Sequence, residues 1–255
     1  MGTGTERPAG EVSTDTSSAA APSGVPGLSR RDRLRIATTE EIKSAARDLL
    51  LPPPGGGDLS LRAVAREVGM TPSAIYRYFE SRQDLMEALA RDALESAGAA
   101  LRAADEAEAG RTAFDRAVAM ATAYRRWCLE HPAEFGLVFR ADGERAQHVR
   151  LDTIAFYRVP LEVMTSELQA GRLRLPDHTD VLPTVRADVL EMASLVAPDG
   201  VSPATIVYLI SVWSSVHGFV CLELFGHVPS LLDDADDAFE RHVRLVLRSL
   251  LVYDF

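Results

Sequence analysis

Apolar residues recur at spacings of three and four along nearly the whole chain, and this period constrains the fold more than any other feature. Strand-like alternation of apolar and polar residues is nearly absent. Proline and glycine divide the pattern into segments of roughly ten to twenty-five residues. No repeat of about 20 to 50 residues is visible, which argues against a solenoid. The sequence therefore predicts an all-α protein of about nine to ten helices arranged as a bundle.

Capping residues predict where the helices begin and end. The first helix is expected to begin near "TTEEI", where Thr38 and Glu41 have capping-box spacing. Ser60 is placed to cap a second helix that ends at Gly69, and Thr71 is placed to cap a third. Longer helices are then expected at residues 81–104, 112–130, 132–140, 145–170, 181–197, 203–226 and 234–251.

Charge is distributed unevenly along the chain. The 255 residues carry a formal net charge of -10, but residues 29–82 contain ten Lys and Arg against seven Asp and Glu. A nucleic-acid-binding face is therefore expected near the N-terminus, if the protein has one. The arginine-rich stretch "SRRDRLR" (29–35) is either an arm that enters the minor groove of DNA or a solvated tail.

Cysteine usage and the N-terminal stretch bear on location. Cys128 and Cys221 are the only cysteines, and neither has ligand spacing with another Cys or His. No metal site and no cofactor are predicted, and a reduced, cytoplasmic protein is the simplest interpretation. The first 28 residues lack the basic start and apolar stretch of a signal peptide and are rich in small and polar residues. We interpret residues 1–29 as a disordered tail.

The stretch "DLSLRAVAREVGMTPSAIYRYFESRQDL" has the layout of a DNA-binding helix-turn-helix, because a short turn containing glycine separates two short helices. Placing Ile75 and Phe79 inward, at about 100° per residue, directs Arg77 to the opposite side. The other outward or flanking residues of the second helix are Ser73, Ala74, Tyr76 and Tyr78.

The outward side chains have chemistry suited to DNA. An arginine can donate two hydrogen bonds to guanine, a tyrosine hydroxyl can reach a phosphate or base edge, and small residues permit close approach. Ser60, Thr71 and Arg82 are candidate phosphate contacts, and Arg62 can reach either backbone or base. The alternative is an ordinary helix pair, in which the tyrosines are partly buried core residues.

The same stretch closely resembles the DNA-binding domain of the tetracycline-repressor (TetR) family. The family features appear as Val64-Ala65, Gly69-Met70, residues 75–79 (Ile-Tyr-Arg-Tyr-Phe) and residues 82–85. The chain departs from the family in its long loop "LLLPPPGGG". It also has Leu61 where some members contact DNA through threonine, which leaves that phosphate contact in doubt.

The resemblance implies roles for individual residues. Tyr76 and Tyr78 resemble the residues that touch backbone and base edges, and Arg82 matches a phosphate-binding lysine. Groove-facing positions are occupied by Ser73, Ala74 and Arg77. It also implies a DNA-binding domain at residues 30–82 and a ligand-binding and dimerisation domain at residues 83–255.

Two later stretches resemble a TetR subgroup marked by Trp, His and Gly in one late helix. They are "AYRRWCLEHPAEFGLVF" (123–139) and "SVWSSVHGFVCLELFGH" (211–227), and the marker residues are Trp213, His217 and Gly218. The resemblance implies a homodimer formed through the last two helices, whose paired recognition helices read a pseudo-palindrome in double-stranded DNA.

The resemblance further implies a pocket for an unknown small-molecule effector among the middle helices. Such pockets are mostly apolar and aromatic, with a few polar groups. The candidate lining residues are Tyr124, Trp127, Phe135, Phe139, Phe156, Tyr157, Trp213 and His217. Aromatic residues at helical spacing are also what a bundle core is made of, so a core role for each of them remains the alternative.

The helix expected at residues 203–226 is apolar nearly all round and has one charged residue, Glu223. Its length alone would suit a membrane span. Serines and His217 interrupt it, no Lys or Arg flanks it, and an amphipathic helix follows. We therefore predict a core helix without membrane attachment.

Enzyme motifs are not found in the sequence. There is no GxSxG, HExxH or P-loop, and "DDADD" (233–237) lacks the spacing of a calcium-binding loop. The sequence therefore predicts a homodimeric TetR-type transcription regulator that is not an enzyme, most simply a repressor released from its operator by a small molecule. The alternatives are an all-α ligand-binding or interaction protein with a degenerate helix-turn-helix, and an α-helical enzyme.

Overall fold

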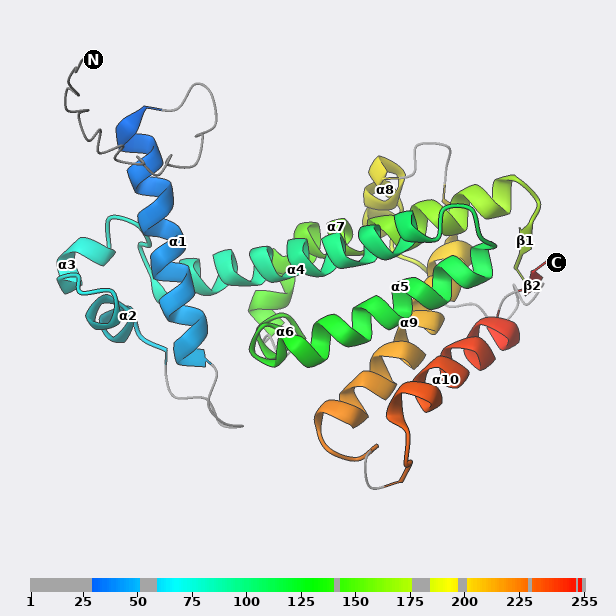
Figure 1. Cartoon of the computed structure of the whole chain (residues 1–255). Coiled ribbons are helices and arrows are strands. Elements are labelled where there is room, and N and C mark those ends of the chain that lie inside the picture. The colour runs from blue at the N-terminus through cyan, green and yellow to red at the C-terminus, as the bar shows by residue number, and fades with distance from the viewer. Residues whose placement is uncertain are drawn as a thin grey trace, which may run out of the picture. The chain divides into compact units, whose positions relative to one another are not determined.

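The computed structural model describes residues 29–50, 59–139, 143–175, 184–196, 201–228, 231–250 and 252–253. Within these ranges it contains ten helices and one pair of short antiparallel strands (Figure 1). The prediction of an all-α fold is confirmed, and the strand pair is an addition to it. The predicted tail, apart from Ser29, and the Pro- and Gly-rich loop at residues 51–57 lie outside the described residues.

The helices follow one another with short connections. In chain order they are α1 (Arg30–Leu50), α2 (Leu61–Glu67), α3 (Pro72–Ile75), α4 (Arg82–Ala107), α5 (Ala113–Glu130), α6 (Pro132–Phe139), α7 (Gly143–Gln169), α8 (Ala187–Val196), α9 (Pro203–Leu224) and α10 (Ala235–Leu250). Strand β1 (Leu173–Arg174) pairs with β2 (Val252–Tyr253). From α4 onward the predicted bounds agree within a few residues, except that α8 begins later than expected.

The first helix begins at Arg30, so the start predicted near Thr38 is wrong. Ser29 supplies the cap instead, because its hydroxyl accepts from the Asp32 N–H (3.1 Å) and donates to the Asp32 carboxylate (2.6 Å). The arginines of the stretch 29–35 therefore lie exposed in the first turns of a helix. This stretch is helical, and its contact with the minor groove of DNA stays a prediction.

The chain divides into two compact units, one that ends at Glu40 and one that comprises residues 41–255. Within the second unit, a cluster that we call the N-terminal core is formed by buried side chains of α1 to α4 with one residue of α6. It comprises Ile42, Ala45, Ala46, Leu59, Leu61, Val64, Ala65, Ile75, Phe79, Leu85, Met86, Leu89, Ala90 and Leu137. The core includes α4 as far as Ala90, beyond the domain boundary expected at residue 82.

A second cluster, the bundle core, is formed by α4 from Ala93 onward together with α5, α6, α7, α9 and α10. Its largest fully buried side chains are Tyr124, Phe156 and Phe239. One helix, α4, thus contributes to both cores. The apolar helix α9 is long enough and apolar enough to cross a membrane, by length and composition, and is the only such helix in the described part of the chain. Its inner face packs into the bundle, against α10 and α5 (Figure 1).

A buried arginine joins three helices of the bundle. Arg125 of α5 donates from Nε and Nη2 to the carboxylate of Glu223 in α9, both at 2.6 Å. Its Nη1 donates to Asp236 in α10 at 2.7 Å, and its guanidinium lies 5.3 Å from the ring centre of Phe239. The arginine is 8% exposed, so the pair with Glu223 is almost fully shielded from water.

Candidate nucleic-acid interface and internal cavity

The turn between α2 and α3 is fixed by its own hydrogen bonds. Ser60 caps α2, since its hydroxyl accepts from the Ala63 N–H at 3.2 Å. The helix ends at Gly69, whose φ of 67° is a left-handed conformation that favours glycine. The Met70 N–H then donates to the Ala65 carbonyl at 2.7 Å. The chain therefore reverses sharply between the two helices.

The second helical segment of the motif starts after Thr71, with Pro72 at its first position. The α-helix proper is short, but hydrogen bonds continue from the Tyr78 and Phe79 N–H groups to the Ile75 carbonyl, at 2.9 and 3.1 Å. We call residues 72–79 the recognition segment. Thr71 makes no side-chain capping bond, and its hydroxyl lies 3.2 Å from that of Ser73.

Burial divides the recognition segment into two sides. Ile75 and Phe79 are buried in the N-terminal core. Ser73, Tyr76 and Arg77 are exposed, and half of the Tyr76 side chain is open to solvent. The structure leaves Ala74 and Tyr78 half-buried, with the Tyr78 ring packed against the core.

The candidate DNA contacts beside the recognition segment differ in whether another group of the protein already binds them. Arg62 is exposed in the first turn of α2. Arg82 is also exposed, but its Nε donates to the Leu59 carbonyl at 2.6 Å. This bond ties the start of α4 to the start of α2, a positioning role that the sequence did not indicate. The start of α4 itself is fixed by reciprocal bonds between Ser81 and Asp84.

Ion pairs hold α1 against α4. Lys43 and Arg47, on successive turns of α1, both approach the carboxylate of Asp92, at 3.0 and 2.8 Å. All three side chains are partly shielded from solvent. These pairs fix the part of α1 that belongs to the N-terminal core relative to the helix that enters the bundle.

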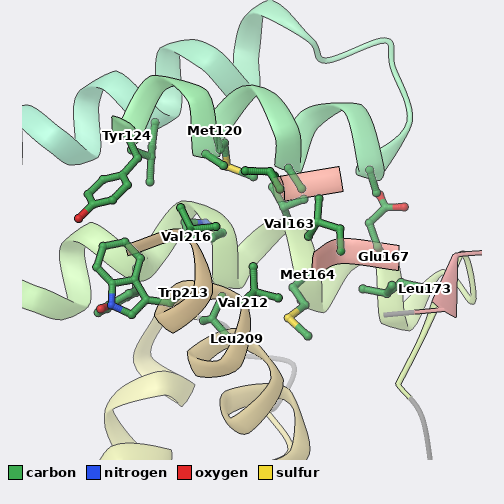
Figure 2. A pocket seen from close by; sticks show the side chains of 18 of the residues that line it. Met120, Tyr124, Val163, Met164, Glu167, Leu173, Leu209, Val212, Trp213 and Val216 are labelled. Atoms are coloured by element: carbon green, nitrogen blue, oxygen red, sulfur yellow. The ribbon is translucent and has the colours of Figure 1, made fainter. Parts of the chain in front are cut away.

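The bundle contains a cavity of about 110 Å³. Side chains from α4, α5, α7, α9 and α10 line it, and most of them are aliphatic or aromatic. Four residues expected to line a pocket do so: Tyr124, Phe156, Tyr157 and Trp213. Figure 2 shows Tyr124 and Trp213 at one end of the cavity, Glu167 and Leu173 at the other, and Met120, Val163 and Met164 between them.

The other four expected residues are not in the wall of this cavity. Trp127 is buried, and its indole N–H donates to the Ser96 hydroxyl at 3.1 Å. Phe135 and Phe139 pack on the imidazole of His217, with ring centres 5.5 and 4.8 Å away. These residues form an aromatic cluster behind the wall. Helical spacing predicted that these side chains point into the bundle, but not which of them reach the cavity.

A neutral hydrogen-bonded chain links α5 to α9 behind the cavity. The Tyr124 hydroxyl lies 2.7 Å from Nδ1 of His217, whose Nε2 lies 3.4 Å from Sγ of Cys221. Burial lowers the pKa of His217 and raises the pKa of Tyr124. The imidazole is therefore neutral and shares a hydrogen bond with the phenol. Burial also raises the pKa of Cys128 to about 12, so this thiol stays protonated.

Among the described residues, Glu167 is the only charged side chain that lines the cavity, and its charge is balanced. Arg172 donates to both carboxylate oxygens, from Nε at 2.7 Å and from Nη2 at 2.9 Å. Arg116 approaches the same carboxylate at 3.9 Å. The hydrogen bonds from Arg172 lower the pKa of Glu167, so the group is ionised at neutral pH.

Sequence patterns of known proteins match both parts of the chain. The pattern of "Bacterial regulatory proteins, tetR family" matches residues 55–89. That of "Tetracyclin repressor-like, C-terminal domain" matches residues 117–246, half of the chain. The chain belongs to the TetR family. Its helix-turn-helix is therefore the DNA-binding part of a transcriptional regulator.

Relatives of this TetR-family chain span nearly its whole length. The HTH-type transcriptional regulator Mb1846 of Mycobacterium bovis is 28% identical over a 229-residue alignment that covers 87% of this chain and 95% of the relative. The structure of regulatory protein SCO4313 superposes with a TM-score of 0.61 at 27% identity and covers 86% of this chain and 100% of that one. A tetR-family regulatory protein from Rhodococcus RHA1, with a TM-score of 0.53 and 17% identity over 83% and 96% of the two chains, shares the fold.

Two features of this TetR-family protein were missed by sequence reasoning. Glu167 follows Phe156, Pro160 and Val163 at spacings of three and four, so a signal was present: a carboxylate on the apolar stripe of a helix. Arg125 gave no such signal, because its partners lie on distant helices. The predicted DNA-contact residues all lie in or beside the helix-turn-helix.

Proposed function

We propose that this regulator is a homodimeric repressor that binds pseudo-palindromic double-stranded DNA and is released when a small molecule enters the bundle cavity. The observation that carries the proposal is the division of the recognition segment. Ile75 and Phe79 fix the segment to the N-terminal core, while Ser73, Tyr76 and Arg77 are exposed and free to meet a partner. A helix held this way presents a fixed set of groups to a DNA groove.

We assign the contacts by what each side chain can donate. Arg77 reads a base, because its guanidinium is exposed at the centre of the segment. Ser73 and Ala74 are small and allow close approach to the groove. Tyr76 and Tyr78 contact backbone or base edges through their hydroxyls. The phosphate contacts are Ser60, Arg62, Thr71 and Arg82.

An apolar stripe on α9 supports the dimer. Exposed or half-exposed residues recur on one face at spacings of four and three: Ile210, Ser214, Gly218, Leu222 and Phe225. A Cβ added at Gly218 would meet nothing within 4 Å in this chain. The close helix crossing that a glycine permits is therefore available to a second copy. Leu245 on α10, the other helix of the proposed interface, is exposed as well.

A continuous set of contacts supports coupling between cavity and DNA. Trp213 of the cavity wall packs on Phe139 of α6, with ring centres 5.9 Å apart. The same helix contributes Leu137 to the N-terminal core. In addition, α4 begins beside the recognition segment and contributes Leu101 to the cavity wall. A ligand that favours one arrangement of this wall can shift the recognition segments of a dimer.

Electrophoretic gel shift with DNA from upstream of the protein's own gene tests the proposal. We expect a sequence-selective shift at submicromolar protein that weakens steeply with salt. A shift that is equal on random DNA, or no shift, would contradict the proposal and favour an all-α binding protein with a degenerate helix-turn-helix. Because the proposed partner is chromosomal DNA, we also propose a cytoplasmic location and no enzymatic activity.

Light scattering on size-separated protein tests the dimer. Leu222→Lys places a charge in the proposed interface, and the side chain is exposed in the single chain, so folding is retained. We expect this variant to elute as a monomer. Leu195→Lys, at an exposed leucine of α8, is the matched control and should remain dimeric. A monomeric wild-type protein, or a dimeric Leu222→Lys variant, would contradict the assignment.

A further inference from the structure

The cavity wall has an uncommon charge balance. The carboxylate of Glu167, the one that lines it in the described part of the chain, is held by Arg172 on both oxygens. Arg116, which also approaches Glu167, donates to Asp105 at 2.8 and 2.9 Å. The four groups carry two positive and two negative charges. The fork of each arginine is therefore already occupied, and no carboxylate is left over for a cationic ligand.

The opposite end of the cavity is lined by aromatic residues that carry neutral polar groups. The Tyr124 hydroxyl is engaged by His217. The hydroxyl of Tyr157 and the indole N–H of Trp213 have no hydrogen-bond partner in the part of the chain that the structure describes. Burial raises the pKa of Tyr157, so its proton is retained. Their rings meet edge to face, with centres 5.2 Å apart, so both residues lie at the same end of the cavity.

The volume limits the size of a ligand in this arrangement. About 110 Å³ is comparable with the apolar cavity of roughly 150 Å³ that accepts a benzene molecule. The wall between the two ends is hydrocarbon, contributed by residues such as Met120, Val163 and Val212. A charged molecule would lose its hydration there without gaining a counter-charge.

We propose that the cavity binds a small, uncharged, largely apolar molecule that carries one oxygen able to accept hydrogen bonds from Tyr157 and Trp213. An anion is disfavoured because it would face the carboxylate of Glu167 while both arginines are already paired. A cation is disfavoured because that carboxylate is already neutralised. This inference rests on the proposed role of the cavity as the effector site, and it names the chemical class of the effector.

Four probes of similar size test the inference: acetophenone, ethylbenzene, benzoate and benzylammonium. The chain has two tryptophans, so the two indole N–H signals in an NMR spectrum of ¹⁵N-Trp-labelled dimer report separately on the cavity and on the core. Acetophenone should shift the Trp213 signal and leave that of Trp127, which is bonded to Ser96, in place. Trp213→Phe assigns the signals.

The expected order of affinity is acetophenone, then ethylbenzene, then the two ions at least tenfold weaker. Tyr157→Phe should reduce the ratio of acetophenone to ethylbenzene affinity about fivefold, because one hydrogen bond is lost. Arg172→Met should raise benzylammonium affinity at least fivefold, since it removes the arginine that donates to both oxygens of Glu167. The matched control is Arg158→Met, which removes an exposed arginine paired with Glu162 on the same helix. It should leave benzylammonium affinity unchanged.

An ion that binds as tightly as acetophenone, or the failure of every probe to shift the Trp213 signal at its solubility limit, would overturn the inference. A failure of Arg172→Met to change benzylammonium affinity would overturn the argument from charge balance. Gel shift on the same preparation separates the two proposals. Loss of selective DNA binding contradicts the regulator proposal, whereas a preference for charged probes in a DNA-binding protein contradicts only the ligand class.

Discussion

The N-terminal core and the bundle core use the same kinds of residue in opposite ways. In the N-terminal core, Val64, Ala65 and Ile75 are fully buried, and the charged groups of the helix-turn-helix lie outside. The bundle contains a cavity, and it buries the charged side chains of Arg125 and Glu167, each beside oppositely charged partners. A closed core with polar groups outside holds a recognition surface in one shape. A core that encloses space can respond to what fills it.

The largest effect is expected where charge is buried. Arg125→Ala leaves Glu223 shielded from water without its partner, which should lower the free energy of unfolding by about 3–5 kcal/mol. Urea unfolding measures the loss. Arg241→Ala removes an arginine that pairs with Asp237 on the surface of α10, and it should have no measurable effect. Equal losses in the two variants would show that the buried position of Arg125 has no energetic significance.

The second prediction compares a substitution in the closed N-terminal core with the same substitution beside the bundle cavity. Ala65→Leu adds three carbons where no room exists, and it should lower the free energy of unfolding by about 1–3 kcal/mol. Ala117→Leu places the same group beside the cavity and should cost clearly less. Paired thermal and urea unfolding curves provide the measurement. If Ala117→Leu costs as much as Ala65→Leu, the cavity is not accessible space.

A third test separates base from phosphate contacts within the exposed surface. Arg77→Ala should reduce discrimination at one base pair of each half-site by about 1–3 kcal/mol. Arg82→Ala should weaken binding to all sequences and lower the dependence on salt. Binding to systematically altered DNA at several salt concentrations measures both. An equal loss on specific and random DNA in the two variants would contradict the division of roles.

The smallest effect concerns two hydroxyl groups at helix starts. Ser60→Ala removes a capping bond and should lower the free energy of unfolding by about 1 kcal/mol. Thr71 makes no such bond, so Thr71→Ala should leave unfolding nearly unchanged. Both should weaken DNA binding if both hydroxyls contact phosphate. If Thr71→Ala lost as much stability as Ser60→Ala, the two hydroxyls would stabilise their helix starts equally, and the proposed difference in capping would be wrong.

The helices were predictable because their signals are local. Ser60 at the start of α2 caps its helix as the sequence indicated. The start of α1 was misplaced because two segments have capping spacing, and the earlier pair, Ser29 with Asp32, forms the cap. Local spacing does not rank two caps in one helix, since a longer helix gains hydrogen bonds that the pattern does not count.

The cavity was only half predictable, for a different reason. The period of a helix gives the direction of a side chain, whereas lining a cavity also depends on which neighbouring helix covers it. Trp127 and Tyr124 lie on the same helix, yet only Tyr124 reaches the cavity. The balance of charge around Glu167 depends on Arg116 of another helix, and no spacing in the sequence joins those two residues.

Because α4 belongs to both cores, its length is constrained more strictly than its composition. Its contribution changes from the N-terminal core to the bundle core between Ala90 and Ala93. One inserted residue at this point would turn everything beyond it by about 100° and advance it by about 1.5 Å. Every apolar side chain on one side would then face the wrong direction. Evolution can therefore exchange residues along this helix with some freedom, but it cannot add or remove one near its middle without rebuilding one of the two cores.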